Sequence, residues 1–399
     1  MQNWRQAIKT PITYRVGNNS IRVQTNFIYA VATTGVSLLI ILYMFFPQSR
    51  SGLKMINQNG IVANDLELGH NHLRSNNNNA NRWYNATYPL TSVKRTEFEA
   101  VYKIGIISDL DVDSKSTSDK NVWISYLKIG YFTYNFASKK VKLDWEPNVT
   151  VLRSSISLGG RGLELSELIV FNGKLYTVDD RTGIIYEIDG DKVVPWVILA
   201  DGDGHQLKGF KSEWMAVKNE ELYIGGLGKE WTSPKGELIN LYPQWVKVIS
   251  STGEVQHLDW HKKYNAMRKA AKITYPGYII HESCAWSPVH QQWYFLPRRA
   301  SHHRYDEKLD ERQGTNLIIK CNENWDSIHV ERIGDITPTR GFSSFKFVPG
   351  TEDQVVIALK SEEIDGVVAT YILVFTLEGN ILLPETRIAD MKYEGIEFI

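Results

Sequence analysis

A short element recurs five times along the chain in variant form. In each copy an oxygen-bearing side chain, Glu in four copies and Ser in one, stands just ahead of an apolar run with strand character. From Glu167 onward the steps between copies are 46, 69, 61 and 51 residues, around the size of one four-stranded propeller blade with its loops. The repeat therefore predicts five strands whose polar heads face one central axis. The copies begin at Ser166-Glu167, Ser212-Glu213, His281-Glu282, Phe342-Ser343 and Tyr393-Glu394.

Short β-branched and aromatic stretches alternate with turn signals from residue 101 onward. Hairpin dipeptides stand between many of them, as in Asn172-Gly173 and Asp189-Gly190. Only residues 264–272 have the pattern of a longer helix. About 300 residues at about 60 per unit predict an all-β, five-bladed β-propeller over residues 93–399. The predicted strands cover residues 101–108, 123–132, 168–171, 175–178, 184–188, 193–199, 222–224, 245–249, 294–296, 317–319, 355–359 and 371–375.

A 20-residue run without a charge, Phe27 to Phe46, precedes the globular part. It is long enough to cross about 30 Å of hydrocarbon as a helix. Basic residues and no acid stand before it, which predicts a cytosolic N-terminus. We interpret the run as a signal anchor in a type II, single-pass protein, and a cleaved signal is the alternative. The predicted parts are a cytosolic tail at 1–26, the transmembrane helix at 27–46 and a flexible, Asn-rich lumenal stem at 47–92.

The composition narrows the partners and the compartment. With 45 basic and 45 acidic residues the net charge is balanced, so we expect no nucleic-acid partner. The sequons at Asn85 and Asn148 lie on the predicted lumenal side, which would make the protein a glycoprotein. Cys284 and Cys321 are the only cysteines, and the sequence leaves their pairing open.

Carboxylates that face one axis predict a metal site. Buried, unpaired Glu side chains beside one another are unfavourable unless a cation sits among them. An all-oxygen ligand set suits calcium better than zinc. The alternative is that each glutamate merely satisfies loop amides or surface arginines. The candidate metal ligands are Ser166, Glu167, Glu213, Glu282, Ser343 and Glu394.

Four further charged residues are candidates for chemistry. Asp109 and Asp111 follow a predicted strand and could position a water or bind a metal, although such acidic loops are often only solvated turns. Arg161 and Arg298 adjoin two copies of the repeated element, and a guanidinium binds phosphate oxygens in a bidentate way. Surface ion pairs with acids at 306–310 are the alternative. The sequence contains no P-loop, G-x-S-x-G or H-E-x-x-H motif, so covalent serine or zinc hydrolysis is unsupported.

Longer motifs resemble the calcium-activated nucleotidase, or apyrase, family from about residue 95 to residue 399. They include Ile107-Ser-Asp-Leu-Asp111, Gly225-Gly-Leu-Gly-Lys-Glu-Trp231 and Lys392-Tyr-Glu-Gly-Ile-Glu-Phe-Ile399. The resemblance implies a five-bladed propeller that holds calcium in its channel and hydrolyses nucleoside di- and triphosphates. It also places an arginine, here Arg298, at the nucleotide. The family's calcium positions fall on Ser166, Glu213, Glu282, Ser343 and Glu394, so that Ser166 and Glu167 compete for one ligand role.

Membrane-anchored members of that family set further expectations. The resemblance implies a diphosphatase of the Golgi or endoplasmic reticulum that acts on UDP, GDP and IDP, and less on ADP and triphosphates. Such an enzyme would support glycosylation and proteoglycan synthesis, and a homodimer is also implied. One alternative is a secreted apyrase that acts on extracellular ATP and ADP after release by cleavage. Another is a non-catalytic, calcium-binding propeller.

The mechanism that we expect is direct in-line attack of water on the terminal phosphoryl group. Calcium would neutralise charge on the phosphate oxygens, and Arg298 and Arg161 would hold them. Asp109 or Asp111 would orient the water. Positioning and electrostatics would then supply most of the acceleration.

Overall fold

The computed structural model describes residues 12–16, 19–23 and 84–399. β1 (Ile12–Val16) and β2 (Asn19–Val23) form an antiparallel hairpin in a unit, residues 1–77, that is separate from the unit of residues 78–399. The predicted transmembrane segment 27–46 and the stem up to residue 83 lie outside the described residues. Within the described ranges, no helix has both the length and the apolar character needed to cross a membrane.

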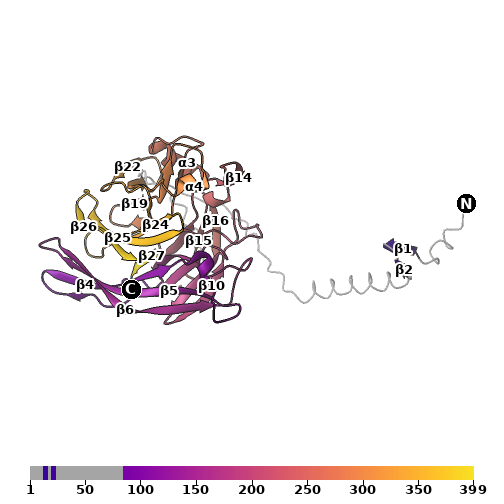
Figure 1. Ribbon diagram of the computed structural model, residues 1–399, viewed down its shortest axis with the longest axis horizontal. Helices are drawn as coiled ribbons and strands as arrows, with labels where there is room; N and C mark the ends of the chain where they lie inside the picture. The colour runs from indigo at the N-terminus through magenta and orange to yellow at the C-terminus, as the bar shows by residue number, and fades with distance from the viewer. Residues whose placement is uncertain (1–11, 17–18, 24–83) are drawn as a thin grey trace, which may run out of the picture. The chain divides into compact units, whose positions relative to one another are not determined.

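The larger unit is an all-β, five-bladed β-propeller, as predicted (Figure 1). Four of its antiparallel sheets take their four strands in chain order. These are β7 (Leu165–Phe171), β8 (Lys174–Asp179), β9 (Ile184–Asp189) and β10 (Lys192–Ile198); β11 (Trp214–Lys218), β12 (Glu221–Gly225), β15 (Trp245–Ile249) and β16 (Val255–Asp259); β18 (Cys284–Ser287), β19 (Gln292–Phe295), β21 (Leu317–Asn322) and β22 (Ile328–Arg332); and β23 (Arg340–Phe347), β24 (Val355–Ile364), β25 (Val367–Thr376) and β26 (Ile381–Ala389).

The remaining sheet joins the first and last strands of the propeller. Its order is β27 (Tyr393–Phe398), β4 (Glu99–Ser108), β5 (Trp123–Asn135) and β6 (Val141–Ser154), with β3 (Lys94–Arg95) paired to β4. Ile396 of β27 lies opposite Ile106 of β4, and Figure 1 shows yellow β27 beside the purple strands of this sheet. The last strand therefore closes the ring of blades, and the strand edges that remain at the channel are short and protected.

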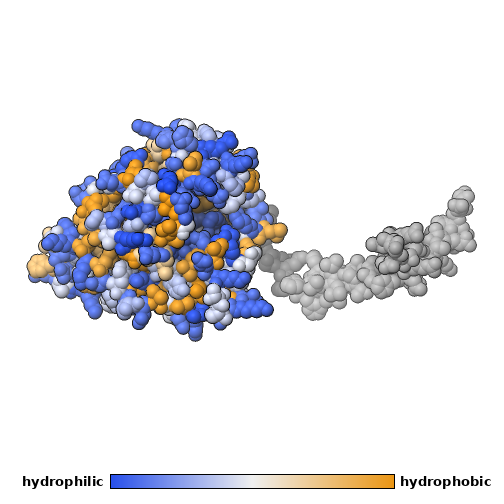
Figure 2. Space-filling view, viewed as in Figure 1, coloured by the Kyte–Doolittle hydropathy of each residue, from blue (hydrophilic) through white to orange (hydrophobic). Residues whose placement is uncertain are grey.

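The innermost strands β7, β11, β18, β23 and β27 contact one another around the channel. β7 and β27 are buried along their whole length, whereas β6 and β26 on the outside are mostly half-buried or exposed. Apolar side chains pack between neighbouring blades, as Ile104 and Phe132 do with Val374. Full burial of such a side chain contributes about 1.5–3 kcal/mol. On the face in Figure 2, hydrophobic residues are scattered among hydrophilic ones.

The structure contains a predicted hairpin turn and the predicted helix, and its two cysteines are free. Asn172 and Gly173 both have positive φ, 48° and 71°, as a type I′ hairpin turn requires. The helix predicted at 264–272 is α3 (His261–Ala270). Cys284 and Cys321 are buried and free, so they do not form the disulfide that the sequence left open. The short elements are η1 (Asp111–Ser114), η2 (Tyr242–Gln244), α4 (Glu307–Asp310), the pair β13 (Trp231–Thr232) and β14 (Leu238–Asn240), and the pair β17 (Tyr278–Ile280) and β20 (Arg299–Ser301).

Candidate active site

The heads of the inner strands gather oxygen-bearing side chains at one end of the channel. Glu213 directly precedes β11, Glu282 stands two residues before β18, and Glu394 is the second residue of β27. Ser166 and Ser343 are on β7 and β23, and the Ser343 hydroxyl lies 3.5 Å from the carbonyl oxygen that precedes Glu394. None of these five residues is more than 7% exposed. The repeat found in the sequence thus marks the N-terminal ends of the five inner strands, from two residues before the strand to its fourth residue.

A cavity of about 540 Å³ opens at this end of the channel, which we call the charged mouth. Six of the predicted site residues line it: Asp109, Asp111, Glu213, Glu282, Arg298 and Glu394. Arg161, Ser166, Glu167 and Ser343 are not among the lining residues. The lining also contains charged residues that the sequence did not single out, namely Asp180, Lys211, Lys229, Glu307, Glu363 and Lys392.

The buried guanidinium of Arg298 joins three carboxylates. Its Nη1 lies 2.7 Å from Glu282 Oε2 and 3.1 Å from Glu394 Oε1, and its Nη2 contacts Glu363. Although burial opposes the charge, these carboxylates raise the pKa of Arg298 well above its ordinary value. Arg299 instead reaches Asp310, with 4.0 Å between Nε and Oδ2. The ion pair with the acids at 306–310, which was the alternative for Arg298, is therefore formed by Arg299 and not by Arg298.

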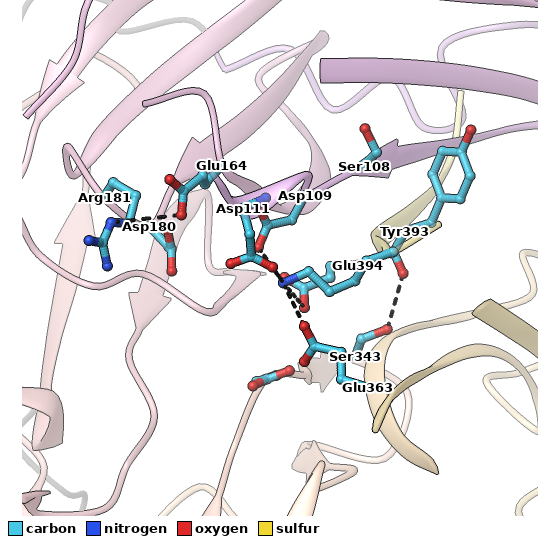
Figure 3. Close-up of polar contacts among 12 residues, drawn as sticks. Ser108, Asp109, Asp111, Glu164, Asp180, Arg181, Ser343, Glu363, Tyr393 and Glu394 are labelled. Atoms are coloured by element: carbon cyan, nitrogen blue, oxygen red, sulfur yellow. Dashed lines mark hydrogen bonds and ion pairs between the residues drawn. The ribbon is translucent and has the colours of Figure 1, made fainter. Parts of the chain in front are cut away.

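Lys392 forms the second cationic centre of the charged mouth. Its Nζ lies 2.5 Å from Asp111 Oδ2, 2.8 Å from Asp109 Oδ2 and 3.4 Å from Glu363 Oε1. Figure 3 shows Asp109, Asp111, Glu363 and Glu394 converging there. Burial alone would raise the pKa of Asp109, but Lys392 lowers it, so that Asp109 stays ionised. Burial and the neighbouring Asp109 raise the pKa of Asp111.

Lys211 is the third cation, and it joins Asp180 to Glu213. Its Nζ contacts Asp180 Oδ2 and lies 2.8 Å from Glu213 Oε1. Even so, burial raises the pKa of Glu213 to about 8, and the charges of Glu282 and Asp180 act in the same direction. Burial also raises the pKa of Glu394 well above its ordinary value. The protein's own cations therefore compensate these two carboxylates incompletely.

A further carboxylate, Glu164, adjoins the charged mouth. Asp109, Asp111 and Glu164 each offer a carboxylate oxygen, and these oxygens lie within 4.8 Å of one another. Arg161 grips Glu164 at 2.7 Å through Nε and at 2.6 Å through Nη2, and it reaches Asp111 at 3.4 Å. Burial raises the pKa of Glu164 to about 7. The guanidinium of Arg161 thus binds a carboxylate, which leaves fewer of its N–H groups free to bind a phosphate.

The two residues that compete for the first ligand role have different surroundings. Glu167 Oε1 accepts a hydrogen bond from Ser344 Oγ at 2.7 Å and lies 3.2 Å from Lys346 Nζ. Ser166 Oγ is buried and has no hydrogen-bond partner among the described residues. Glu167 Oε2 also has no hydrogen-bond partner among the described residues, so both residues have a free oxygen, but Glu167 already has a cation, Lys346, beside it.

The donor set fits calcium. A hard cation would offset the excess of carboxylates and would give Ser166 Oγ a partner. Within the part of the chain that the structure describes, no His or Cys lines this cavity, whereas zinc sites usually contain these residues as ligands. Eight carboxylates line the cavity against four cationic groups, the former being Asp109, Asp111, Asp180, Glu213, Glu282, Glu307, Glu363 and Glu394, and the latter Lys211, Lys229, Arg298 and Lys392.

Two of the residues that sequence reasoning missed had left a signal. Lys211 and Lys392 each stand two residues ahead of a repeated glutamate, Glu213 and Glu394. Residues at this spacing in an extended chain share one face, so a Lys-x-Glu pattern in two copies predicts cations at the same mouth. Glu363, on β24, stands in no such pattern and is brought in by the fold alone.

A channel mouth that gathers carboxylates around a buried arginine and three lysines has the groups to bind a hard cation and an anionic ligand together, as a metal-using hydrolase does. Residues 110–399 match the family model described as Apyrase. The match covers well over half of the chain, and the chain therefore belongs to the apyrase family, as the resemblance of its motifs predicted.

Individual relatives agree with this assignment. The chain is 56% identical to soluble calcium-activated nucleotidase 1 of Rattus norvegicus over 316 residues, which cover 79% of this chain and 78% of that protein. It is 42% identical to the apyrase of Cimex lectularius over 390 residues, covering 97% and 99% of the two chains. It is 46% identical to apyrase apy-1 of Caenorhabditis elegans over 314 residues, covering 77% and 88%.

Proposed function

We propose that this chain hydrolyses nucleoside di- and triphosphates to shorter phosphates in a calcium-dependent reaction at the charged mouth. The observation that carries the proposal is the excess of carboxylates over cations in the cavity. A nucleoside diphosphate is itself an anion and would be repelled by this lining without an added cation. The names of the relatives, calcium-activated nucleotidase and apyrase, support the same reading.

Each group of residues has a role in this proposal. Ser166, Glu213, Glu282, Ser343 and Glu394 would hold calcium, which when bound neutralises charge on the phosphate oxygens. Arg298 would add a guanidinium from the inner wall of the cavity. Asp109 suits the orientation of the attacking water because Lys392 keeps it ionised. Asp111 and Arg161 would support that arrangement through Lys392 and Glu164, to which they bind.

The aromatic wall of the cavity suits the nucleoside part of the substrate. Trp231 and Tyr305 line the cavity, and an aromatic face stacks with a base of any kind. Lys208 and Lys229 lie over these two rings, at 4.4 Å and 4.2 Å from their centroids. A preference for UDP, GDP and IDP over ADP and triphosphates remains our prediction, and a panel of these nucleotides measures it.

The cellular setting is also part of the proposal. We propose a Golgi or endoplasmic reticulum enzyme with a lumenal propeller, anchored by residues 27–46, that supports glycosylation. The supporting observations are the charge-free run and the basic residues before it. Mass spectrometry of the mature N-terminus distinguishes an anchored protein from a secreted one. Size-exclusion chromatography with light scattering tests the homodimer.

Glu213→Gln tests the reaction itself. It removes a carboxylate from the candidate calcium site while keeping the shape of the side chain. We expect calcium-stimulated phosphate release from UDP to fall roughly a hundredfold or more. Glu187→Gln is the matched control, because Glu187 forms an ion pair with the exposed Lys174 at 2.8 Å, away from the cavity. Wild-type activity in a folded Glu213→Gln protein would mean that Glu213 is not part of the proposed calcium site.

A further inference from the structure

A second cavity, of about 350 Å³, lies at the opposite end of the channel, and we call it the apolar mouth. The same five inner strands line it three residues farther along, through Ile169, Ala216, Ala285, Lys346 and Glu397. At about 3.3 Å per residue, three residues along a strand correspond to about 10 Å. Among the residues that the structure describes, none lines both cavities. The two mouths are therefore separate sites built on one set of strands.

The walls of the apolar mouth are mainly hydrophobic and aromatic. Met215, Trp286 and Phe347 line it. Residues 84–88 form part of the wall, and hydrogen bonds and ring contacts hold them there. Tyr84 packs on Phe171 with 5.5 Å between the ring centroids, and Tyr88 donates a hydrogen bond to Glu397 at 2.9 Å. A cavity of this size and lining is ready-made for a small molecule.

The charged groups in the apolar mouth are predominantly acidic. Lys346 lies 3.2 Å from Glu167, and it also opposes the rise that burial causes in the pKa of Glu397. Among the described residues, neither Glu397 nor Asp353 forms an ion pair. Glu397 accepts hydrogen bonds from Tyr88 and from backbone N–H groups, and Asp353 accepts one from Ser287 at 2.7 Å. Two carboxylates and one lysine thus line an apolar space, and the lysine forms its ion pair with Glu167, which is not part of this lining.

We propose that the apolar mouth binds a small apolar amine. Its ammonium group meets Asp353 and Glu397, and its hydrocarbon or aromatic body packs against Trp286 and Phe347. An ammonium gains both charge-assisted hydrogen bonds and contact with aromatic faces in such a place. A carboxylate ligand would face two carboxylates and one lysine, which already has Glu167 beside it. A neutral ligand would leave the charges uncompensated.

The binding test uses three probes that share one aromatic body. 2-Phenylethylamine carries an ammonium group, 2-phenylethanol is neutral and phenylacetate is anionic. With the full-length protein we expect calorimetry and thermal shift to detect the amine, with an affinity at least about tenfold above that of the other two. Equal binding of the alcohol and the amine would overturn the proposal, as would absence of amine binding at millimolar concentration.

Two variants locate the amine. Asp353→Asn retains the acceptor for Ser287 but removes a charge, and we expect about tenfold weaker amine binding. Asp191→Asn, a change at an exposed turn, is the matched control and should bind like the wild type. Ala285→Phe fills the cavity and should abolish binding. Phosphate release should be unchanged in all three because the charged mouth has a separate lining. Unaltered amine binding by Asp353→Asn and Ala285→Phe would place the amine elsewhere and overturn the assignment.

Discussion

The charged mouth and the apolar mouth are made from the same five strands, yet their chemistry differs at nearly every position. Glu213, Glu282 and Glu394 stand at one end, and Ala216, Ala285 and Glu397 stand three residues later at the other. At the charged mouth, lysines and Arg298 bridge an excess of carboxylates. At the apolar mouth, aromatic rings and backbone hydrogen bonds surround two carboxylates. The two ends of one propeller strand can therefore differ in character. Its first residues supply charged groups to one cavity, and residues three positions later supply mainly apolar lining to the other.

Arg298→Met perturbs the charged mouth and carries the largest expected effect. Without the guanidinium, Glu282 and Glu394 are buried without their shared cation, and we expect a loss of about 3–5 kcal/mol of unfolding free energy with calcium chelated. Phosphate release should also be lost. Calcium should restore part of the stability, because in the proposed site it binds the folded protein at the same carboxylates. Urea unfolding with and without calcium measures both effects.

The control for that variant is Arg312→Met. Arg312 is exposed and lies 3.5 Å from Asp365, so its loss should cost less than about 1 kcal/mol. Equal losses in the two variants would mean that burial of Arg298 does not matter for stability.

Lys346→Met tests whether Glu167, which lies beside a residue of the apolar mouth, belongs to the proposed calcium site. It leaves Glu167 buried without a cation, and we expect a loss of about 3 kcal/mol. Calcium should not restore this stability, because Glu167 lies beside Lys346, which lines the apolar mouth, and is not among the residues that line the charged mouth. Adding Glu167→Gln should recover part of the loss by removing the buried charge. Rescue of Lys346→Met by calcium would instead identify Glu167 as a metal ligand.

Lys229→Met tests the pH dependence of the charged mouth. Burial lowers the pKa of Lys229 from 10.5 to about 8. The unfolded chain therefore binds more protons than the folded one between pH 8 and pH 10.5, so this residue makes stability rise with pH across that window. The rise is about 2–3 kcal/mol, and Lys229→Met should lack it. Urea unfolding at pH 7.5 and pH 10 compares the variant with the exposed control Lys235→Met, which should follow the wild type.

The inner strands were predictable, whereas among the outer strands only β10 (Lys192–Ile198) was predicted, at residues 193–199. The inner copies combine a polar head with an apolar run, and residues 165–171 are buried throughout. Strands β6 and β26 carry mixed polar sequences with Pro147 and Pro384 inside them, and no prediction covered them. Each of these strands forms because it pairs with a neighbouring strand that is more deeply buried. The strand propensity of one segment contains little information about which strand it pairs with.

The candidate site divides in a similar way. Glu213, Glu282 and Glu394 could be found because one strand position recurs in every blade. Lys392, which joins acids more than 280 residues apart in sequence, depends on the closure of the ring. Glu167 shows the limit of a pattern that follows the sequence alone, because the fold places its carboxylate beside Lys346 of another blade.

The closing strand β27 has a consequence for synthesis. β27 pairs with β4, whose residues leave the ribosome almost 300 residues earlier. Until Lys392 and Glu394 have been made, β4 has no inner neighbour and Asp109 has no ammonium partner. A growing chain can thus hold four finished blades and still contain no complete cavity. Competence for hydrolysis would then arrive in a single step, when the last strand docks.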